Sequence, residues 1–439
     1  MTIRKALSKR STRLTSAYRS GPLSVPAFRL LAVGQFSSTV GDYCYAIALP
    51  WLVLSNRSSA ASLGITLACY GVPRALLTLP GGSLADRFGP RLMMLSSDAV
   101  RCAVTTVFTV FAASHVSSLA AVAPMAAVLG ACSALFLPAS MTMMPSLIDN
   151  AKLTSANALY TGFVQTGSML GPLIGGVLVA MAGPAPAFAV DAVSYLISAA
   201  CLALVGRSVS RPARPEPGQA PSAEQAVSAA KPAAKPVAVS IWTLLRRDRF
   251  LRIVLVVSVT ANFAVTGIAE VTLPVLAHAR YGAAGFGAVL ACIAVMSIIG
   301  ALVVAWGGDR FARAALIAGG FQVAAVAITV APFLGGLPGL TVGLSVFGLA
   351  LGFDNAVWGT LIQRWAPPEL LGRVWGVLML APTVSFPLST LIAGVLTTHL
   401  GPIVVFPFAG VLLALSYLYG LSHREFRELG KPQQAGDLG

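Results

Sequence analysis

Apolar stretches of membrane-spanning length recur along the whole chain, separated by short polar or charged segments. A run of about 20 apolar residues crosses the hydrocarbon core of a bilayer as an α-helix. The pattern predicts an all-α membrane protein with twelve spans, near residues 27–54, 60–80, 91–113, 117–140, 154–181, 184–206, 250–279, 285–306, 312–333, 337–364, 372–398 and 401–422.

A segment rich in proline and alanine interrupts the pattern after the sixth span. It has no apolar period, which is typical of a disordered linker. The linker divides the spans into two bundles of six helices. The predicted units are a basic tail over 1–26, a bundle over 27–206, the linker over 207–249, a second bundle over 250–422 and a tail over 423–439.

Short motifs recur in the same order in the two bundles. The repeated pairs are the Leu-Pro ending at Pro50 and at Pro274, the Asp-Arg-Phe of 86–88 and 309–311, and Gly-Pro at 183–184 and 401–402. Many transporters are built from two such repeats with a binding site between them. The repeats therefore predict two pseudo-symmetric six-helix bundles.

The chain has a net charge of +15, although only 10% of its residues are charged and 56% are hydrophobic. Nearly all of its 30 Lys and Arg residues lie in the tails and the even-numbered loops, and only Arg57 and Arg280 lie in odd-numbered loops. The positive-inside rule then places both termini and the linker in the cytoplasm. The basic charge indicates topology and an attraction to anionic lipid, and it predicts no nucleic-acid partner. The N-terminal tail superficially resembles a transit peptide, but the apolar run after it is too long for a signal peptide, which favours a retained tail.

Motifs of soluble chemistry are missing from the sequence. The six cysteines all lie in predicted spans without metal-ligand spacing, and the four histidines form no zinc motif. There is no G-x-x-x-x-G-K-[ST] loop for ATP and no hydrolase signature. We therefore expect no metal, no cofactor and no enzymatic activity.

Three spans contain an acidic residue near the middle of the membrane, where a charge costs about 3 kcal/mol and its presence indicates function. Each lies on a polar stripe at helical spacing. The predicted site consists of Asp42 with Gln35 and Tyr45 in span 1, Glu270 with Asn262 and Thr266 in span 7, Asp354 with Asn355 and Trp358 in span 10, Gln165 in span 5 and Arg74 in span 2. Desolvation favours the neutral form of a buried carboxyl group, so these acids are candidate proton carriers or counter-ions for a cationic substrate. Alternatively each is a structural partner, for example Asp354 with Arg74. Asp191, near the outer end of span 6, is expected at the membrane interface.

The charged loop between spans 2 and 3 contains a second candidate group. Gly89 permits a tight turn there, and the carboxylate and guanidinium groups can pair across it and hold helix ends together in one state. The alternative is that the bases only keep the loop in the cytoplasm. The predicted latch comprises Gly82, Asp86, Arg87, Gly89, Arg91, Asp98, Arg101 and the repeated Asp309 and Arg310.

Span 5 contains glycines at every fourth position. They predict a close helix contact, and Pro172 predicts a bend; the alternative is packing alone. The residues are Gly167, Gly171, Pro172, Gly175 and Gly176.

Both motifs resemble those of a known family. The loop "GGSLADRFGPR" is similar to the signature between spans 2 and 3 of the major facilitator superfamily, and "GSMLGPLIGG" is similar to its antiporter-associated span-5 pattern. Segments of span 1 and of the loop between spans 10 and 11 resemble its drug, macrolide and siderophore exporters. The resemblance covers nearly the whole chain outside the tails and linker. It implies the twelve-helix fold, with spans 1, 4, 7 and 10 around a central cavity. Proton-coupled exporters of this family often have a base in span 4, which this chain lacks; Arg74 or Arg101 would substitute for it.

The sequence therefore predicts a monomeric multi-pass protein of the cell membrane that exports an amphipathic small molecule in exchange for protons. One alternative is an uptake symporter on the same scaffold. A second alternative, from another class, is a non-transporting membrane receptor or assembly factor.

Overall fold

A computed structural model describes residues 21–55, 59–149, 152–205, 249–308, 314–365 and 368–427. These residues form helices joined by short turns, and no strand occurs among them. The first bundle consists of η1 (Pro22–Ser24), α2 (Pro26–Leu54), α3 (Ala60–Phe88), α4 (Pro90–Ala113), α5 (Leu119–Leu147), α6 (Leu153–Ala182) and α7 (Pro184–Leu204). We call it the N half.

The second bundle, the C half, begins with α10 (Arg249–Gly267), which continues through η4 (Ile268–Thr272) into α11 (Leu273–Arg280). The remaining helices are α12 (Gly282–Gly307), α13 (Ala314–Val330) with η6 (Ala331–Phe333), α14 (Gly336–Trp365), α15 (Pro368–Leu400), α16 (Pro402–Ser422) and α17 (Arg424–Arg427). Counting α10 to α11 as one rod, the described residues contain the twelve long rods that the hydropathy pattern predicts. The candidate linker lies mostly outside the described residues.

Gly-Pro pairs separate consecutive helices at three sharp turns. Gly89, Gly183 and Gly401 have φ values of 88°, 76° and 81°, and each precedes a proline at the first position of the next helix. Positive φ favours glycine, and proline is suited to the first helical turn because its missing N–H has no partner there. The turns at Gly183 and Gly401 are equivalent in the two halves, as the repeat predicts.

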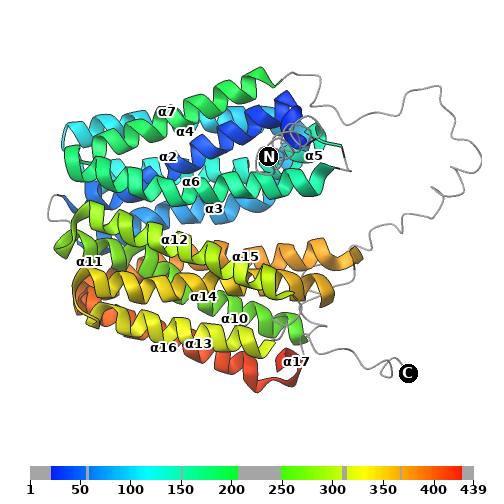
Figure 1. The fold of residues 1–439 in the computed structure, drawn as a ribbon. Helices are drawn as coiled ribbons and strands as arrows, with labels where there is room; N and C mark the ends of the chain where they lie inside the picture. Colours follow the sequence, from blue (N-terminus) through cyan, green and yellow to red (C-terminus); the bar gives the residue numbers. More distant parts are fainter. Residues whose placement is uncertain are drawn as a thin grey trace, which may run out of the picture.

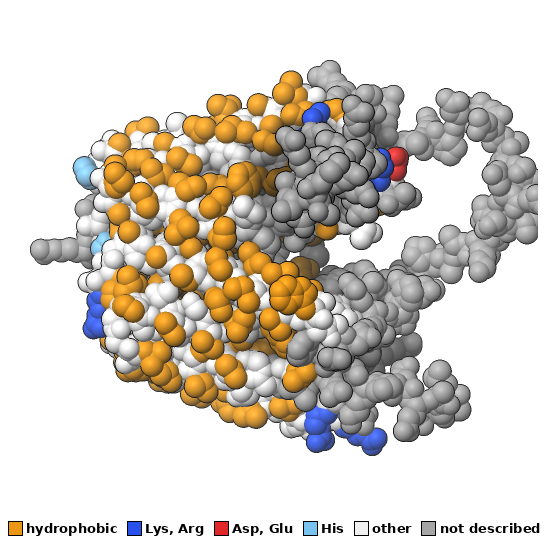
Figure 2. All heavy atoms as spheres, in the orientation of Figure 1, with side chains coloured by type: hydrophobic (Ala, Val, Ile, Leu, Met, Phe, Trp, Pro, Cys, Tyr) orange, Lys and Arg blue, Asp and Glu red, His pale blue; other side chains and the backbone are white. Residues whose placement is uncertain are grey.

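Ten of the described helical stretches are long and apolar enough to cross a membrane. The helix α2 falls outside this group because its polar stripe lowers its mean hydropathy, and the described part of α13 is only 17 residues long. Many large apolar side chains on the outer surface are exposed, and Figure 2 shows that they cover the flank of the bundle while described charges lie at its ends. This distribution is suited to a lipid bilayer.

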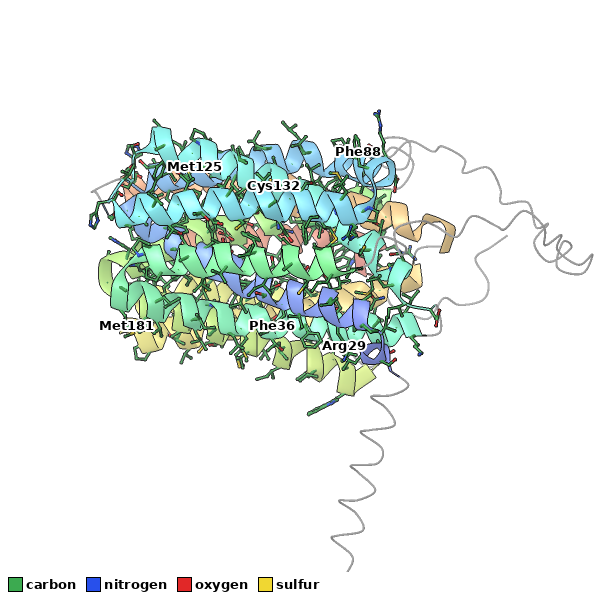
Figure 3. All side chains as sticks on the ribbon, turned by 90° about the horizontal axis from the view of Figure 1, so that it is seen from above. Arg29, Phe36, Phe88, Met125, Cys132 and Met181 are labelled. Atoms are coloured by element: carbon green, nitrogen blue, oxygen red, sulfur yellow. The ribbon has the colours of Figure 1, made fainter. Side chains whose placement is uncertain are left out.

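The two ends of the bundle differ. Helix directions alternate, so residues 21, 205, 249 and 427 all lie at one end, which we call the terminal end; the opposite end is the distal end (Figure 1). Figure 3 shows Arg29 and Phe88 at the terminal end and Met125 and Met181 at the distal end.

The two halves contact each other mainly through two helix pairs, α3 with α15 and α6 with α12. The closest approaches are near the distal end. The main-chain N–H of Ala61 donates to Thr398 Oγ1 at 2.9 Å, and a Cβ atom on Gly64 would lie 2.5 Å from the carbonyl oxygen of Thr390. A Cβ on Gly176 would lie 2.8 Å from the carbonyl oxygen of Ala283. Glycine thus permits backbone contact between the two halves near the distal end.

Candidate functional site

A cavity of about 540 Å³ lies between the two halves. Most of its wall comes from the N half, and Glu270 and Phe386 come from the C half. The polar part of the wall comprises Gln35, Ser38, Asp42, Tyr43, Tyr45, Tyr70, Arg74, Arg101, Ser133, Ser140, Tyr160, Tyr195 and Glu270. Apolar residues such as Leu49, Leu67 and Leu129 line the rest, so the cavity offers both charged and apolar surface to a ligand.

The helix α2 presents its predicted polar stripe to this cavity. Gln35, Ser38, Asp42 and Tyr45 all line it, as their helical spacing implies. Asp42 Oδ1 accepts a hydrogen bond from the hydroxyl of Tyr195 on α7 at 2.5 Å. The carboxyl group is therefore held in a fixed position at the cavity wall.

Arg101 in the cavity wall and Asp98 behind it form a buried pair on α4. Arg101 Nη1 lies 3.8 Å from Asp98 Oδ1, and the side chains are 6% and 0% exposed. Ser198 on α7 donates to Asp98 Oδ2 at 2.6 Å. The guanidinium lies over the rings of Phe136 and Tyr195, at 4.7 and 5.4 Å from their centroids. The wall thus contains a cation held by a carboxylate and two aromatic faces.

The sequence placed these two residues in the latch, and the structure corrects that placement. Arg101 lines the cavity together with Arg74, so the two bases that would substitute for a missing span-4 base both lie at the site. The reason is position along the helix: Asp98 and Arg101 lie about two and three turns beyond Pro90, on a helix that packs closely on α7.

Glu270 reaches the cavity from a local widening of its helix. Residues Ile268–Thr272 form a π-helical turn, in which Leu273 N–H bonds to the carbonyl oxygen of Ile268. Pro274 follows and has no N–H to donate back to Glu270. Single π turns of this kind often occur at functional positions. Arg74 interacts electrostatically with both Glu270 and Asp42, so it is the base shared by the acids of the two halves.

The third predicted acid lies elsewhere. Asp354 lines a separate pocket of about 200 Å³ inside the C half, is 2% exposed and does not meet Arg74. Its neighbours in that pocket include the predicted residues Asn262, Asn355 and Trp358. The aromatic pair Phe321 and Tyr417, stacked at 3.9 Å, also lines it. Thr266 and Gln165 line neither pocket, and Gln165 is exposed on α6.

The loop residues at the terminal end form few contacts. Asp86 and Arg87 are exposed, and Asp86 forms no ion pair with any described residue. A Cβ atom added to Gly82 or Gly89 would have open space around it. Arg91 instead donates from Nε and Nη2 to the main-chain oxygens of residues 202 and 203 at the end of α7, at 2.9 and 2.8 Å. Asp309 and Arg310 lie outside the described residues.

The glycine motif of α6 packs against both halves. A Cβ on Gly167, Gly171 or Gly175 would contact side-chain or main-chain atoms of α2 at 2.6 to 3.0 Å, whereas Gly176 faces α12 of the C half. Pro172 stays within a continuous helix. The motif therefore joins the cavity helix α2 to the contact between the halves.

Several residues in the cavity wall or directly behind it are absent from the sequence-based prediction. Tyr195 and Ser198 belong to a buried polar stripe on α7, together with Asp191 and Ser194. Its helical spacing is the signal in the sequence that indicates a polar face on this span. The aromatic residues Tyr70 and Phe136 gave no such signal, because the same residue types occur throughout the lipid-facing surface.

Known proteins share this architecture. The family model described as "Major Facilitator Superfamily" matches residues 31–328. "Multidrug efflux pump Tap" of Mycobacterium tuberculosis (strain ATCC 25618 / H37Rv) is 27% identical over 416 residues, covering 93% of this chain and 96% of that protein. The solved structure of a POT family transporter in complex with 5-aminolevulinic acid has a TM-score of 0.72 at 13% identity, covering 92% of this chain and 96% of that one.

A second solved structure, a bacterial homologue of the iron transporter ferroportin in an inward-facing state, has a TM-score of 0.70 at 14% identity and covers 94% of this chain and all of that one. The two structural likenesses concern the fold. Since the family model covers more than half of the chain, and the twelve rods form two bundles around a cavity, this protein is a transporter of the Major Facilitator Superfamily.

Proposed function

We propose that the protein exports an amphipathic small molecule by proton antiport, with Asp42 as the carboxyl group that exchanges the proton. The observation that carries this proposal is a single cavity with an acid from each half, Asp42 and Glu270, and apolar surface beside them. Its volume is within the ~300–1,000 Å³ typical of small-molecule sites. Such a wall suits a ligand with one polar or cationic part and one apolar part, such as an antibiotic, a siderophore or a secondary metabolite.

The terminal end is assigned to the cytoplasm. Apart from Arg74 and Arg101 inside the bundle, the described Lys and Arg residues lie at the terminal end, with Arg280 the single exception at the distal end. This asymmetry follows the positive-inside rule. An impermeant maleimide should therefore label single cysteines in 207–249 only after the cells are permeabilised; labelling of intact cells would refute the orientation.

With this orientation, the described state is closed toward the outside. The contacts of α3 with α15 and of α6 with α12 lie at the distal end, and the cavity wall extends to Ser140 and Tyr160 near the terminal end. A cavity reached from the cytoplasm is where an exporter takes up its substrate. Export then requires the distal contacts to break and the terminal end to close, and the latch residues Asp86 and Arg87 are placed to contribute there.

The direction of transport is supported by two features. The α6 glycine motif resembles the antiporter-associated pattern of the family, and it joins α2, which contains Asp42, to the distal contact with α12. The Mycobacterium tuberculosis relative, similar along nearly the whole chain, is called a multidrug efflux pump.

The proton exchange has a simple physical basis. When Asp42 is ionised, the Tyr195 hydroxyl donates to it and Arg101 lies nearby, so the negative charge is stabilised. A cationic group of the substrate would interact with this ionised form and compete with a proton. The cavity then holds either the substrate or the proton, which is the requirement for antiport.

Uptake by inside-out vesicles tests the proposal. A panel of labelled amphipathic antibiotics and cations should accumulate when the lumen is acidified, and a protonophore should abolish accumulation. Asp42→Asn should remove uphill transport while leaving downhill exchange partly intact; Asp149→Asn, an exposed carboxylate outside the cavity, is the matched control. Proton-driven accumulation by right-side-out vesicles instead would indicate an uptake symporter. Absence of any pH-gradient-dependent flux would favour a receptor or assembly factor.

A further inference from the structure

Asp191 on α7 is a completely buried carboxyl group without a partner. Its side chain is 0% exposed, and neither carboxylate oxygen accepts a hydrogen bond from any described residue. The sequence suggests a place at the membrane interface, but the structure buries it where α7 packs on α2. Burying an ionised group without compensation costs several kcal/mol.

The close approach of the two helices explains why Asp191 is sealed from solvent. Gly41 on α2 faces it, and a Cβ there would lie 2.6 Å from Asp191 Oδ1 and against Ser194 Oγ. There is no room beside Gly41 for a basic side chain. The position therefore excludes both bulk water and a counter-ion on this side.

The hydroxyl groups that could serve Asp191 are bonded elsewhere. A hydroxyl has one hydrogen to donate. Ser194 donates to the main-chain oxygen of Asp191 at 2.7 Å, Tyr195 donates to Asp42, and Ser198 donates to Asp98. Tyr195 and Ser198 are thus committed to other carboxyl groups, and the Ser194 hydroxyl, the nearest remaining donor, is bonded to the main chain rather than to the Asp191 carboxylate.

Most of the titratable groups around Asp191 are acids, which add negative charge to its surroundings when they ionise. The groups within electrostatic reach of it are Asp42, Cys44 and Tyr45 on α2, Asp98 and Arg101 on α4, and Tyr195 on α7 itself. The third helix packed on α7 is α6, whose single titratable side chain, Tyr160, lines the cavity instead. Three carboxyl groups therefore share one guanidinium, and that guanidinium is paired with Asp98. If all were ionised, a net negative charge would be buried.

We propose that Asp191 is a proton-binding site distinct from the substrate cavity, and that it holds a proton while Asp42 is ionised. This rests on the proton antiport proposed above and adds a second proton-binding carboxyl group to it. Asp191 does not line the cavity, so substrate cannot displace its proton directly. Asp42 exchanges its proton for substrate, whereas the protonation of Asp191 responds to the charge of Asp42.

Infrared difference spectroscopy of the purified full-length protein tests this assignment without requiring transport. A protonated carboxyl group has a C=O stretching band that a carboxylate lacks, and the band shifts when water is replaced by D₂O. At neutral pH, Asp191→Asn should remove the intensity of one such group. Asp149→Asn, which alters an exposed carboxylate, should leave the band unchanged.

An unchanged band in folded Asp191→Asn would overturn the proposal, even if proton antiport itself were established. Gel filtration and thermal unfolding check the fold of the variant. If Asp191→Asn does not fold, Asp191→Glu keeps the acid and should shift the band frequency, and an unshifted band would overturn the proposal in the same way. Loss of the band in a protein that shows no proton-driven flux would support Asp191 as a proton site and refute the antiport.

Discussion

Gly176 is the point where α6 of the N half touches the backbone of α12 in the C half. A Cβ added there would lie 2.8 Å from the carbonyl oxygen of Ala283 and 3.1 Å from Cα of Gly287. Both neighbours are backbone atoms, which cannot move aside as a flexible side chain does. Gly176→Ala should therefore disfavour the state in which the distal end is closed.

The size of the effect follows from the cost of overpacking a close contact, about 1–3 kcal/mol. The clash exists only while the halves meet at the distal end, so this cost enters the equilibrium between the two states. A shift of 1–3 kcal/mol changes such an equilibrium roughly 5- to 150-fold. Gly175→Ala is the matched control, because its Cβ would lie 2.9 Å from Cα of Cys44 on α2, within the same half. It should strain both states alike.

The assay is a distance distribution between spin labels at Met181→Cys on the N half and Phe333→Cys on the C half, in a cysteine-free background. Both positions are exposed near the distal end, at 82% and 62%. Gly176→Ala should enlarge the long-distance population, and Gly175→Ala should not. Equal shifts in the two variants, or none in Gly176→Ala, would show that this contact does not select between the states.

Three further outcomes are expected. Tyr195→Phe should slow proton-driven export about 10-fold or more, because the hydrogen bond at 2.5 Å to Asp42 is lost at a cost of roughly 1.5–3 kcal/mol. Tyr45→Phe should slow export less, because the Tyr45 hydroxyl has no partner among the described residues. Equal export rates of the two variants in vesicle assays would contradict this expectation. Arg91→Gln should lower the thermal unfolding temperature in detergent, because two hydrogen bonds to the end of α7 are lost, and an unchanged temperature would mean that they add no stability. Asp86→Asn should reduce export at equal expression and leave membrane insertion intact; wild-type flux would leave the loop with a topological role alone.

The fold was largely predictable because each span is specified locally. Apolar length defines the rods, and the Gly-Pro pairs at 183–184 and 401–402 define turns through the φ of glycine and the ring of proline. The stripe of Asp42 also pointed to the cavity as predicted, since helical spacing determines which residues share a face.

Contacts between helices were not predictable in the same way. The spacing of Asp98 and Arg101 places them one turn apart, as expected. Their burial depends on which face of α4 is covered by α7, and the spacing does not contain that information. The separation of Asp354 from the cavity depends on how the C half packs around its own pocket, and spacing within α14 contains no such information. The burial of Asp191 depends on Gly41, a residue 150 positions away in the chain.

The π turn at Glu270 has an evolutionary consequence. When Pro50 is placed over Pro274, Asp42 corresponds to Thr266 and Glu270 corresponds to Ala46. Pro50 lies in an uninterrupted α-helix, whereas Pro274 follows the widened turn. Neither acid has a counterpart in the other repeat, so the ancestral duplication alone does not account for the charge of the cavity. The two carboxyl groups therefore lie at different helical positions in their halves, and exchanging the two spans by protein engineering would not restore the same cavity.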